Sequence, residues 1–206
     1  GINATPITVE VNVDQGTKFF HVGLPDNAVK ESHQRIEAAL KNTGFKMPGK
    51  KVVVNMAPAD IRKEGSAYDL TIAMGILSAS QQIVAENIEQ YIIMGELSLD
   101  GSLQPIKGAL PIAIEARKHG FKGFFLPQQN AREAAIVDSL DVYGISNIKE
   151  VIDFFTGEAT LQPVVINTRD EFYSAQIKSE FDFCDVKGQE NIKRSLEIAA
   201  AGGHNV

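Results

Sequence analysis

The most apolar segment of the chain runs from Leu70 to Ser80. Apolar side chains occupy nearly every position of its first two turns, which predicts a helix that is buried on all sides. A strand is predicted at 52–55, and the loop between that strand and the helix carries charged residues, Pro58 and Gly65. A short charged loop at the N-terminus of a buried helix is where we expect a functional site.

Two strands and a surface helix are predicted ahead of this segment. Residues 7–13 alternate between apolar and polar, as a half-buried strand does, and residues 19–22 supply the returning strand of a hairpin. Asp26 then caps an amphipathic helix. Residues 44–51 nearly match the phosphate-binding pattern G-x4-G-K-[ST], but Lys51 replaces the required hydroxyl and a strand follows in place of a helix. We interpret them as a plain connection.

Strands and helices alternate with short connections after the buried helix. The predicted elements are, in order, a strand at 91–94, a hairpin at 95–106 that turns at Asp100-Gly101, a helix ending near Gly120, a strand at 123–126, a short helix at 129–135, a strand at 141–143 and a helix at 148–155. This alternation is typical of an α/β domain, and it places the end of the domain near Gly157. The periodicity fades over 158–184, which we interpret as a linker, and a new helix is predicted after Asp185.

The composition is that of a globular protein, with 44% hydrophobic and 22% charged residues, and the length suffices to bury a core. The net charge of -6 argues against a protein whose whole surface binds nucleic acid or an anionic membrane. The basic cluster consists of Lys41, Lys46, Lys50 and Lys51. We interpret it as a solvated helix end and loop.

Cysteine and histidine usage narrows the location and the chemistry. A single cysteine excludes an internal disulfide, and no apolar run approaches the roughly 18 residues of a membrane span. No secretory leader precedes the first strand, so we expect a cytoplasmic protein without a membrane partner. The four histidines are widely separated and have no cysteine pair to join, so no metal site is expected.

Seven short motifs are spread over nearly the whole chain. They are VGLPD at 22–26, VKES at 29–32, APAD at 57–60, KEGSAYDL at 63–70, GEL at 95–97, KGQ at 187–189 and AAAGGHN at 199–205. Together they resemble the ComM/YifB family of magnesium-chelatase-related bacterial AAA+ proteins. The resemblance implies an α/β (α+β) Lon-protease-like or ribosomal-protein-like two-layer domain with a mixed sheet at 1–157. A linker would follow at 158–184, and 185–206 would begin an AAA+ ATPase domain that is truncated before its Walker A loop.

The same resemblance implies a role for the intact protein. It would be a hexameric, ATP-dependent motor for DNA branch migration in natural transformation, with ATP and Mg²⁺ as cofactors and branched DNA as a partner. Val186, Lys187, Gly188 and Gln189 match the segment on the adenine side of an AAA+ nucleotide site. The Walker A loop would begin after Val206, so this chain is expected to be an N-terminal fragment that binds no cofactor and contacts its own AAA+ domain.

A Lon-like domain would carry a serine nucleophile and a lysine base, and both positions differ in this chain. Aligned without a gap, the nucleophile position is Ala67 and the lysine position is Leu110. The resemblance therefore implies a retained fold without proteolysis and without catalytic residues. The alternative is a one-residue slip that makes Ser66 the nucleophile and Lys107 its base. We expect instead that Lys107 lies in solvent and that the Ser66 hydroxyl caps the buried helix through a backbone amide.

The charged loop before the buried helix, together with the glutamate of the Gly-Glu hairpin, is the candidate functional site. Its residues are Asp60, Arg62, Lys63, Glu64, Ser66, Asp69 and Glu96. The charges either pair with one another or face a partner subunit or nucleic acid. Exposed ion pairs contribute only about 0 to 1 kcal/mol each, so their density favours an interaction role. We expect Glu96 to be a buried carboxylate that holds the loop backbone.

Three functions follow from these observations. The first is a non-catalytic domain for assembly or nucleic-acid contact in an AAA+ motor, in which the intact protein is a homo-oligomer. The second is a Ser/Lys peptidase related to Lon, which needs Ser66 and Lys107. The third is an ATPase subunit of a magnesium chelatase, which the family name suggests.

Overall fold

The computed structural model describes residues 4–167. The chain divides after Ile166 into two compact units, and the helices and strands of the described residues all belong to the first. The later part of the predicted linker and the adenine-side residues Val186, Lys187, Gly188 and Gln189 lie outside the described residues. The predicted domain boundary at Gly157 stays a prediction.

The first sheet has three strands in the order β1-β3-β2. They are β1 (Thr8–Asp14), β2 (Phe19–Val22) and β3 (Lys51–Ala57). β3 is antiparallel to β1 and parallel to β2, so the predicted hairpin between the first two strands is wrong. The inner positions Val52, Val54 and Met56 of β3 are fully buried, whereas β1 and β2 alternate between half-buried and exposed residues. The central strand is therefore the most completely buried of the three, because neighbours flank it on both sides.

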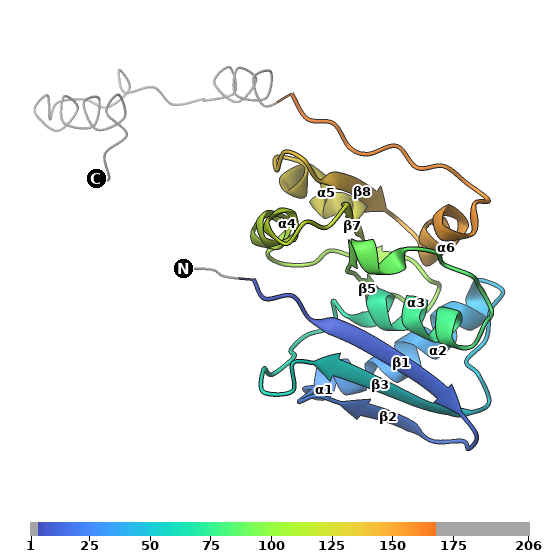
Figure 1. Cartoon of the computed structure of the whole chain (residues 1–206). Helices are drawn as coiled ribbons and strands as arrows, with labels where there is room; N and C mark the ends of the chain where they lie inside the picture. The colour runs from blue at the N-terminus through green and yellow to red at the C-terminus, as the bar shows by residue number, and fades with distance from the viewer. Residues whose placement is uncertain (1–3, 168–206) are drawn as a thin grey trace, which may run out of the picture. The chain divides into compact units, whose positions relative to one another are not determined.

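The inner face of this sheet packs against helices. They are α1 (Asn27–Lys30), α2 (Ser32–Asn42) and α3 (Asp69–Ala79). Asp26 caps α1 as predicted, because its Oδ1 accepts from the backbone N of Val29 at 2.8 Å. α3 lies between the first sheet and the remaining elements, as Figure 1 shows. Ile72 and Ile76 of α3 are fully buried, which confirms the predicted core helix.

The second sheet is parallel and is covered on both faces. Its strands, in the order β4-β7-β8, are β4 (Tyr91–Ile93), β7 (Gly123–Pro127) and β8 (Asp141–Ile145), and its helices are α4 (Ala109–Lys118), α5 (Gln128–Ala134) and α6 (Ile148–Thr156). Phe124 and Leu126 of β7 join a hydrophobic cluster with α4 and α5. Phe125 points to the other face and joins the main core with aromatic residues of α6. Burial on both faces explains why β7 is apolar throughout.

A short 3₁₀ turn, η1 (Ile88–Gln90), leads into β4, and a small hairpin follows β4. The hairpin pairs β5 (Glu96–Leu97) with β6 (Leu103–Gln104), and it turns at Asp100-Gly101 as predicted. Gly101 has a φ of +88°, and a Cβ there would lie 2.7 Å from the Thr43 side chain. Glycine is therefore required at this turn by both the backbone and the packing. These elements confirm the predicted mixed α/β class.

The chain that follows α6 stays bound to the domain. The backbone N of Glu158 donates to the Asp153 carbonyl at 2.8 Å, and that of Val164 donates to the Val142 carbonyl of β8 at 2.8 Å. Leu161 and Val164 pack against the two hydrophobic clusters. The first part of the predicted linker is thus held against the domain surface. Within residues 4–167, the structure contains no helix that is both long and apolar enough to cross a bilayer.

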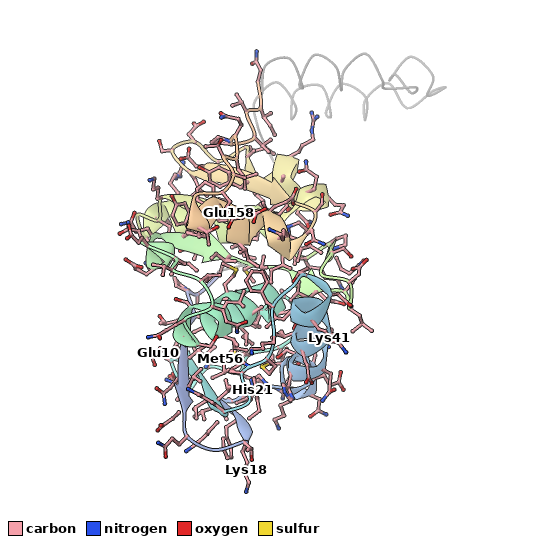
Figure 2. All side chains as sticks on the ribbon, turned by 90° about the vertical axis from the view of Figure 1, so that its right-hand side faces the viewer. Glu10, Lys18, His21, Lys41, Met56 and Glu158 are labelled. Atoms are coloured by element: carbon pink, nitrogen blue, oxygen red, sulfur yellow. The ribbon has the colours of Figure 1, made fainter. Side chains whose placement is uncertain are left out.

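His21 of β2 is a titratable residue whose ring nitrogens are buried. Its ring lies against that of Phe19 in a tilted arrangement with the centroids 4.9 Å apart, and both ring nitrogens are buried without a hydrogen-bond partner among the described residues. Burial, with smaller contributions from His33 and Lys30, lowers the pKa of His21 from 6.5 to about 4. Figure 2 shows His21 on the sheet.

We expect the free energy of unfolding to fall as the pH drops from 6.5 towards 4. The unfolded chain takes up the proton first in this window, whereas above pH 6.5 both states hold the neutral ring and stability is complete. The loss should be of order 1 kcal/mol, because part of the ring touches solvent. Urea unfolding at both ends of the window checks this. His21→Leu should remove most of the difference, and His119→Gln, at an exposed position, should leave it unchanged.

Candidate functional site

A buried ion pair holds the start of α3. Arg35 of α2 donates from Nε to Asp69 Oδ2 at 2.6 Å and from Nη2 to Asp69 Oδ1 at 2.9 Å. The backbone N of Leu97 in β5 donates to Oδ2 at 3.1 Å, and Arg35 Nη2 also reaches the Ala28 carbonyl. The Asp69 side chain is fully buried, and that of Arg35 is 20% exposed. One carboxylate therefore joins α2, α3 and β5 in the two-pronged geometry of the strongest ion pairs.

Protonation of this pair follows from its surroundings. Burial raises the pKa of Asp69 above its ordinary value, and the hydrogen bonds from Arg35 and from the Leu97 amide oppose that rise. The hydrogen bond to Asp69 raises the pKa of Arg35. Arg35 donates two hydrogen bonds to the Asp69 carboxylate and the Leu97 amide donates a third. The ionised form of Asp69 is therefore favoured at neutral pH.

The loop ahead of α3 runs beside the Gly-Glu segment that leads into β5. The backbone N of Leu70 donates to the Gly95 carbonyl at 3.0 Å, and the backbone N of Gly95 donates to the Ala67 carbonyl at 2.9 Å. The Ser66 hydroxyl donates to the Glu96 carboxylate. These contacts fix the residues that a Lon-like domain would use for its nucleophile.

Two expectations about this loop are wrong. Ser66 does not cap α3 through its side chain, because Tyr68 is the N-cap residue of α3 and the Ser66 hydroxyl is turned towards the Glu96 carboxylate, to which it donates. Glu96 is only half-buried and accepts from a side chain. The buried carboxylate that holds backbone here is that of Asp69, through the Leu97 amide.

The charged residues of the loop separate into buried and exposed ones. Lys63 is fully buried, and its ammonium donates to the Pro58 carbonyl. The backbone N of Lys63 donates to the Leu24 carbonyl at 3.1 Å, and its carbonyl accepts from the backbone N of Asp26 at 2.9 Å. Lys63 therefore fastens the loop to the segment before α1.

Arg62 and Glu64, on either side of Lys63, point outward. They form an exposed ion pair with Nε and Oε1 3.0 Å apart, and Asp60 is exposed as well. This pair is the one mutual ion pair that the structure shows among the candidate loop residues between 60 and 69. The idea that the loop charges hold one another thus applies to Arg62 and Glu64, whereas Asp69 and Lys63 have partners elsewhere.

The positions considered for a serine–lysine dyad differ in exposure and in side-chain chemistry. Lys107 is exposed in the turn before α4, as predicted. Ala67 and Leu110, the aligned dyad positions, both pack against the hydrophobic cluster of α4, α5 and β7. Among residues 4–167, the hydrogen bonds of the structure bring Ser66 a carboxylate and no amine. The same residues contain no group of three histidine, cysteine or acidic side chains placed to hold a metal ion.

Arg35 is the site residue that the sequence did not predict. It lies at helical spacing between Ser32 and Ala39, which are both buried, so its side chain borders the inner face of α2. A charged residue on an otherwise buried helix face indicates a buried partner of opposite charge. That signal predicts an ion pair without predicting that Asp69 is the partner.

Two family models and several known proteins match this chain. The family model "Subunit ChlI of Mg-chelatase" matches residues 9–130, and a second model, "Magnesium chelatase, subunit ChlI", matches residues 182–206. The whole chain is 39% identical to uncharacterized protein YifB of Salmonella typhimurium and 38% identical to competence protein ComM of Haemophilus influenzae.

The chain spans 40% of the length of each of these two relatives. Lon protease 2 of Bacillus subtilis is 27% identical over 154 residues, which are 74% of this chain and 27% of that protease. The match to the Lon protease agrees with the mixed α/β architecture. The matches to YifB and ComM cover this whole chain, so they include the loop before α3, the pair of Arg35 and Asp69, and the hairpin of β5 and β6. The chain therefore belongs to the magnesium-chelatase ChlI-related family that includes ComM and YifB.

Proposed function

We propose that this domain is a non-catalytic part of a ComM/YifB-like AAA+ ATPase, through which the protein assembles with further copies or contacts nucleic acid. The single observation that carries the proposal is the state of the loop before α3. Its serine is bound to Glu96, its aspartate is engaged by Arg35, and the two dyad positions hold apolar side chains in a packed cluster. The Ser66 hydroxyl has a carboxylate as its partner, and the structure shows no lysine amine beside it to act as the base of a Ser/Lys dyad, so the loop supports structure.

The nucleotide chemistry belongs to the longer protein in this proposal. ATP and Mg²⁺ would bind the AAA+ module, with Val186, Lys187, Gly188 and Gln189 on the adenine side. We extend the proposal to DNA branch migration in the cytoplasm by the longer protein. The Haemophilus influenzae relative is called competence protein ComM, which supports a role in competence. These assignments rest on the family and on the matched sequence.

The deciding experiment compares this chain with a longer one that continues past Val206 through the Walker A loop. We expect the longer chain to hydrolyse ATP, to form oligomers and to bind branched DNA, and we expect the 206-residue chain to hydrolyse none. Phosphate release and analytical ultracentrifugation measure the first two, and gel shift of a four-way junction measures the third. ATP turnover by the 206-residue chain would contradict the proposal.

A serine-directed fluorophosphonate tests the peptidase alternative. We expect no labelling of Ser66, because its hydroxyl faces a carboxylate and Lys107 lies in solvent. Mass spectrometry of the treated chain, with Ser66→Ala as the matched control and an active serine protease as the positive control, provides the measurement. A label on Ser66 that disappears in Lys107→Met would establish the dyad instead.

Both family models describe subunit ChlI of magnesium chelatase, which favours a second candidate, an ATPase subunit of a magnesium chelatase. That function predicts ATP-dependent Mg²⁺ insertion into a porphyrin when the longer chain is combined with the other subunits of a chelatase. Absorbance of the metallated porphyrin distinguishes this role from DNA branch migration.

A further inference from the structure

Among residues 4–167, no helix packs against one face of the first sheet. α2 and α3 pack against the other face, and along β1 the outward residues Thr8, Glu10, Asn12 and Asp14 are exposed (Figure 1). β2 is an edge strand whose partner within the described residues is β3 alone. This open face, defined by the outward side chains of β1, β3 and β2, has a distinct chemistry on the β2 side.

An aromatic ring lies at the centre of that side. Phe20 of β2 points outward and is 42% exposed, and the ammonium of Lys51 in β3 lies 5.8 Å from the centre of its ring. Phe20 is in register with Val53 of β3. Val22 and Leu24, two and four residues further on, are also exposed, at 49% and 55%. Phe20 and Val22, at alternate positions of β2, form a short stripe of large exposed apolar side chains on this face, which indicates a binding surface.

Lysines surround the end of this stripe. Lys18 lies two residues before Phe20, and its carbonyl accepts from the backbone N of Val52, so it lies beside Lys51. Figure 2 shows the Lys18 side chain extending into solvent at the end of the sheet. Lys50 adjoins Lys51 in the chain and is exposed. These three lysines come from two neighbouring strands and their flanking turns.

The basic area continues around the same end of the sheet into a groove of about 450 Å³. Lys46 and Lys50 line the groove, and its lining contains no carboxylate. The loop that carries them is fixed, because the Gln82 amide accepts from the backbone N of Lys46 at 3.1 Å and donates to its carbonyl at 2.8 Å. The lysines predicted as a solvated loop are therefore presented by an ordered backbone.

Carboxylates on the open face lie on the β1 side. Asp14 is in register with Lys51, and its Oδ1 accepts from the backbone N of Gln15. Glu10 accepts from the side-chain amide of Asn55 at 2.7 Å. The negative groups thus border the surface, and the β2 side joins positive charge to an exposed ring.

We propose that the open face of the first sheet binds single-stranded nucleic acid, with a base stacked on Phe20 and phosphates contacting Lys18, Lys50 and Lys51. Every base has a π-face and every linkage has a negative phosphate, so an aromatic ring flanked by lysines complements both. A protein of net negative charge can carry such a site, because a bound nucleic-acid strand responds to the electrostatic potential of the surface that it contacts. This inference rests on the part of the proposed function in which the domain contacts nucleic acid. It identifies the surface that makes this contact.

The test uses fluorescence anisotropy with the 206-residue chain and 5′-labelled oligothymidylate or oligouridylate of about 20 nucleotides, a length that spans one or more such sites. We expect Phe20→Ala to weaken binding about 5- to 150-fold, which is the loss associated with one stacked base. Lys18→Gln with Lys51→Gln should weaken it further and reduce the slope of log affinity against log salt by about 0.7 for each phosphate that is no longer neutralised. Comparing the two oligonucleotides tells DNA from RNA.

Two controls keep the result specific. Lys122→Gln removes a lysine whose ammonium lies 5.8 Å from the Tyr91 ring in the second sheet, the same arrangement at another place, and should leave affinity unchanged. Phe20→Leu keeps an apolar side chain without a π-face, and it should weaken binding nearly as much as Phe20→Ala. Thermal unfolding of each variant confirms that the fold is intact.

The outcomes separate the surface from the function. Binding that Phe20→Ala and the lysine variants leave unchanged, or binding of duplex and branched DNA without single strands, overturns this surface while the nucleic-acid role stands. Full affinity in Phe20→Leu overturns base stacking on Phe20. Absence of binding to any nucleic acid, by this chain and by the longer one, overturns both.

Discussion

Replacing Asp69 with alanine is expected to lower the free energy of unfolding by about 3 to 5 kcal/mol, the range for breaking a buried ion pair from one side. The change leaves the Arg35 guanidinium, 20% exposed, without its carboxylate, and it leaves the Leu97 amide without an acceptor. The hydrogen bonds of the Asp69 carboxylate join α2, α3 and β5, so the loop that holds Ser66 should loosen at the same time. Urea unfolding followed by circular dichroism measures the free energy, and hydrogen exchange at Leu97 reports the local effect.

The matched control is the exposed pair of Arg62 and Glu64, whose removal should change stability by about 0 to 1 kcal/mol. A second control pairs Asp69→Ala with Arg35→Met, which removes both charges together. That double variant should recover part of the loss, because an apolar pair does not bury an uncompensated charge. If Asp69→Ala proved as mild as the exposed control, the ion pair would not hold the loop.

Phe125→Ala is expected to cost about 3 to 5 kcal/mol, the range for emptying an aromatic position in a packed core. The ring is fully buried, stacks on Tyr143 with centroids 4.7 Å apart, and also contacts Tyr91, Phe154 and Phe155. It therefore joins the central strand of the second sheet to α6. Chemical unfolding measured by tyrosine fluorescence gives the free energy.

The comparison for this prediction is Phe20→Ala, since Phe20 is 42% exposed on the open face and should cost about 1 kcal/mol or less. Phe125→Leu keeps most of the volume and should lose clearly less than the alanine variant. Equal losses in Phe125→Ala and Phe20→Ala would mean that the aromatic cluster does not stabilise α6 on the sheet.

Local patterns predicted the elements well, because each pattern is settled within a few residues. The period of two in β1 and the nearly unbroken apolar run of α3 each depend on which side of one element meets the core. The same patterns say nothing about which strand pairs with which. β2 follows β1 after a short turn, as in a hairpin, yet it pairs with β3, whose inner face is buried most completely.

The candidate site divides along the same line. The sequence located the loop and the exposed Lys107, because turn residues and glycines mark them locally. It did not show that Lys63 would turn inward between two exposed neighbours, or that Asp69 would meet an arginine 34 residues earlier. Those outcomes depend on how α2 packs beside α3. The local sequence pattern does not determine that packing.

The pairing of β1 with β3 has a consequence for how the chain folds. The first strand pairs along its whole length with residues that are synthesised only after β2, α1 and α2, from Asp14 with Lys51 to Thr8 with Ala57. Its inner face also packs on α3, which comes later still. Contacts that close such long loops slow the search for the native state, so refolding should be slower than in a helical domain of similar size. Until α3 emerges from the ribosome, the apolar side of β1 has no permanent neighbour, and the nascent chain is most exposed to aggregation in that interval.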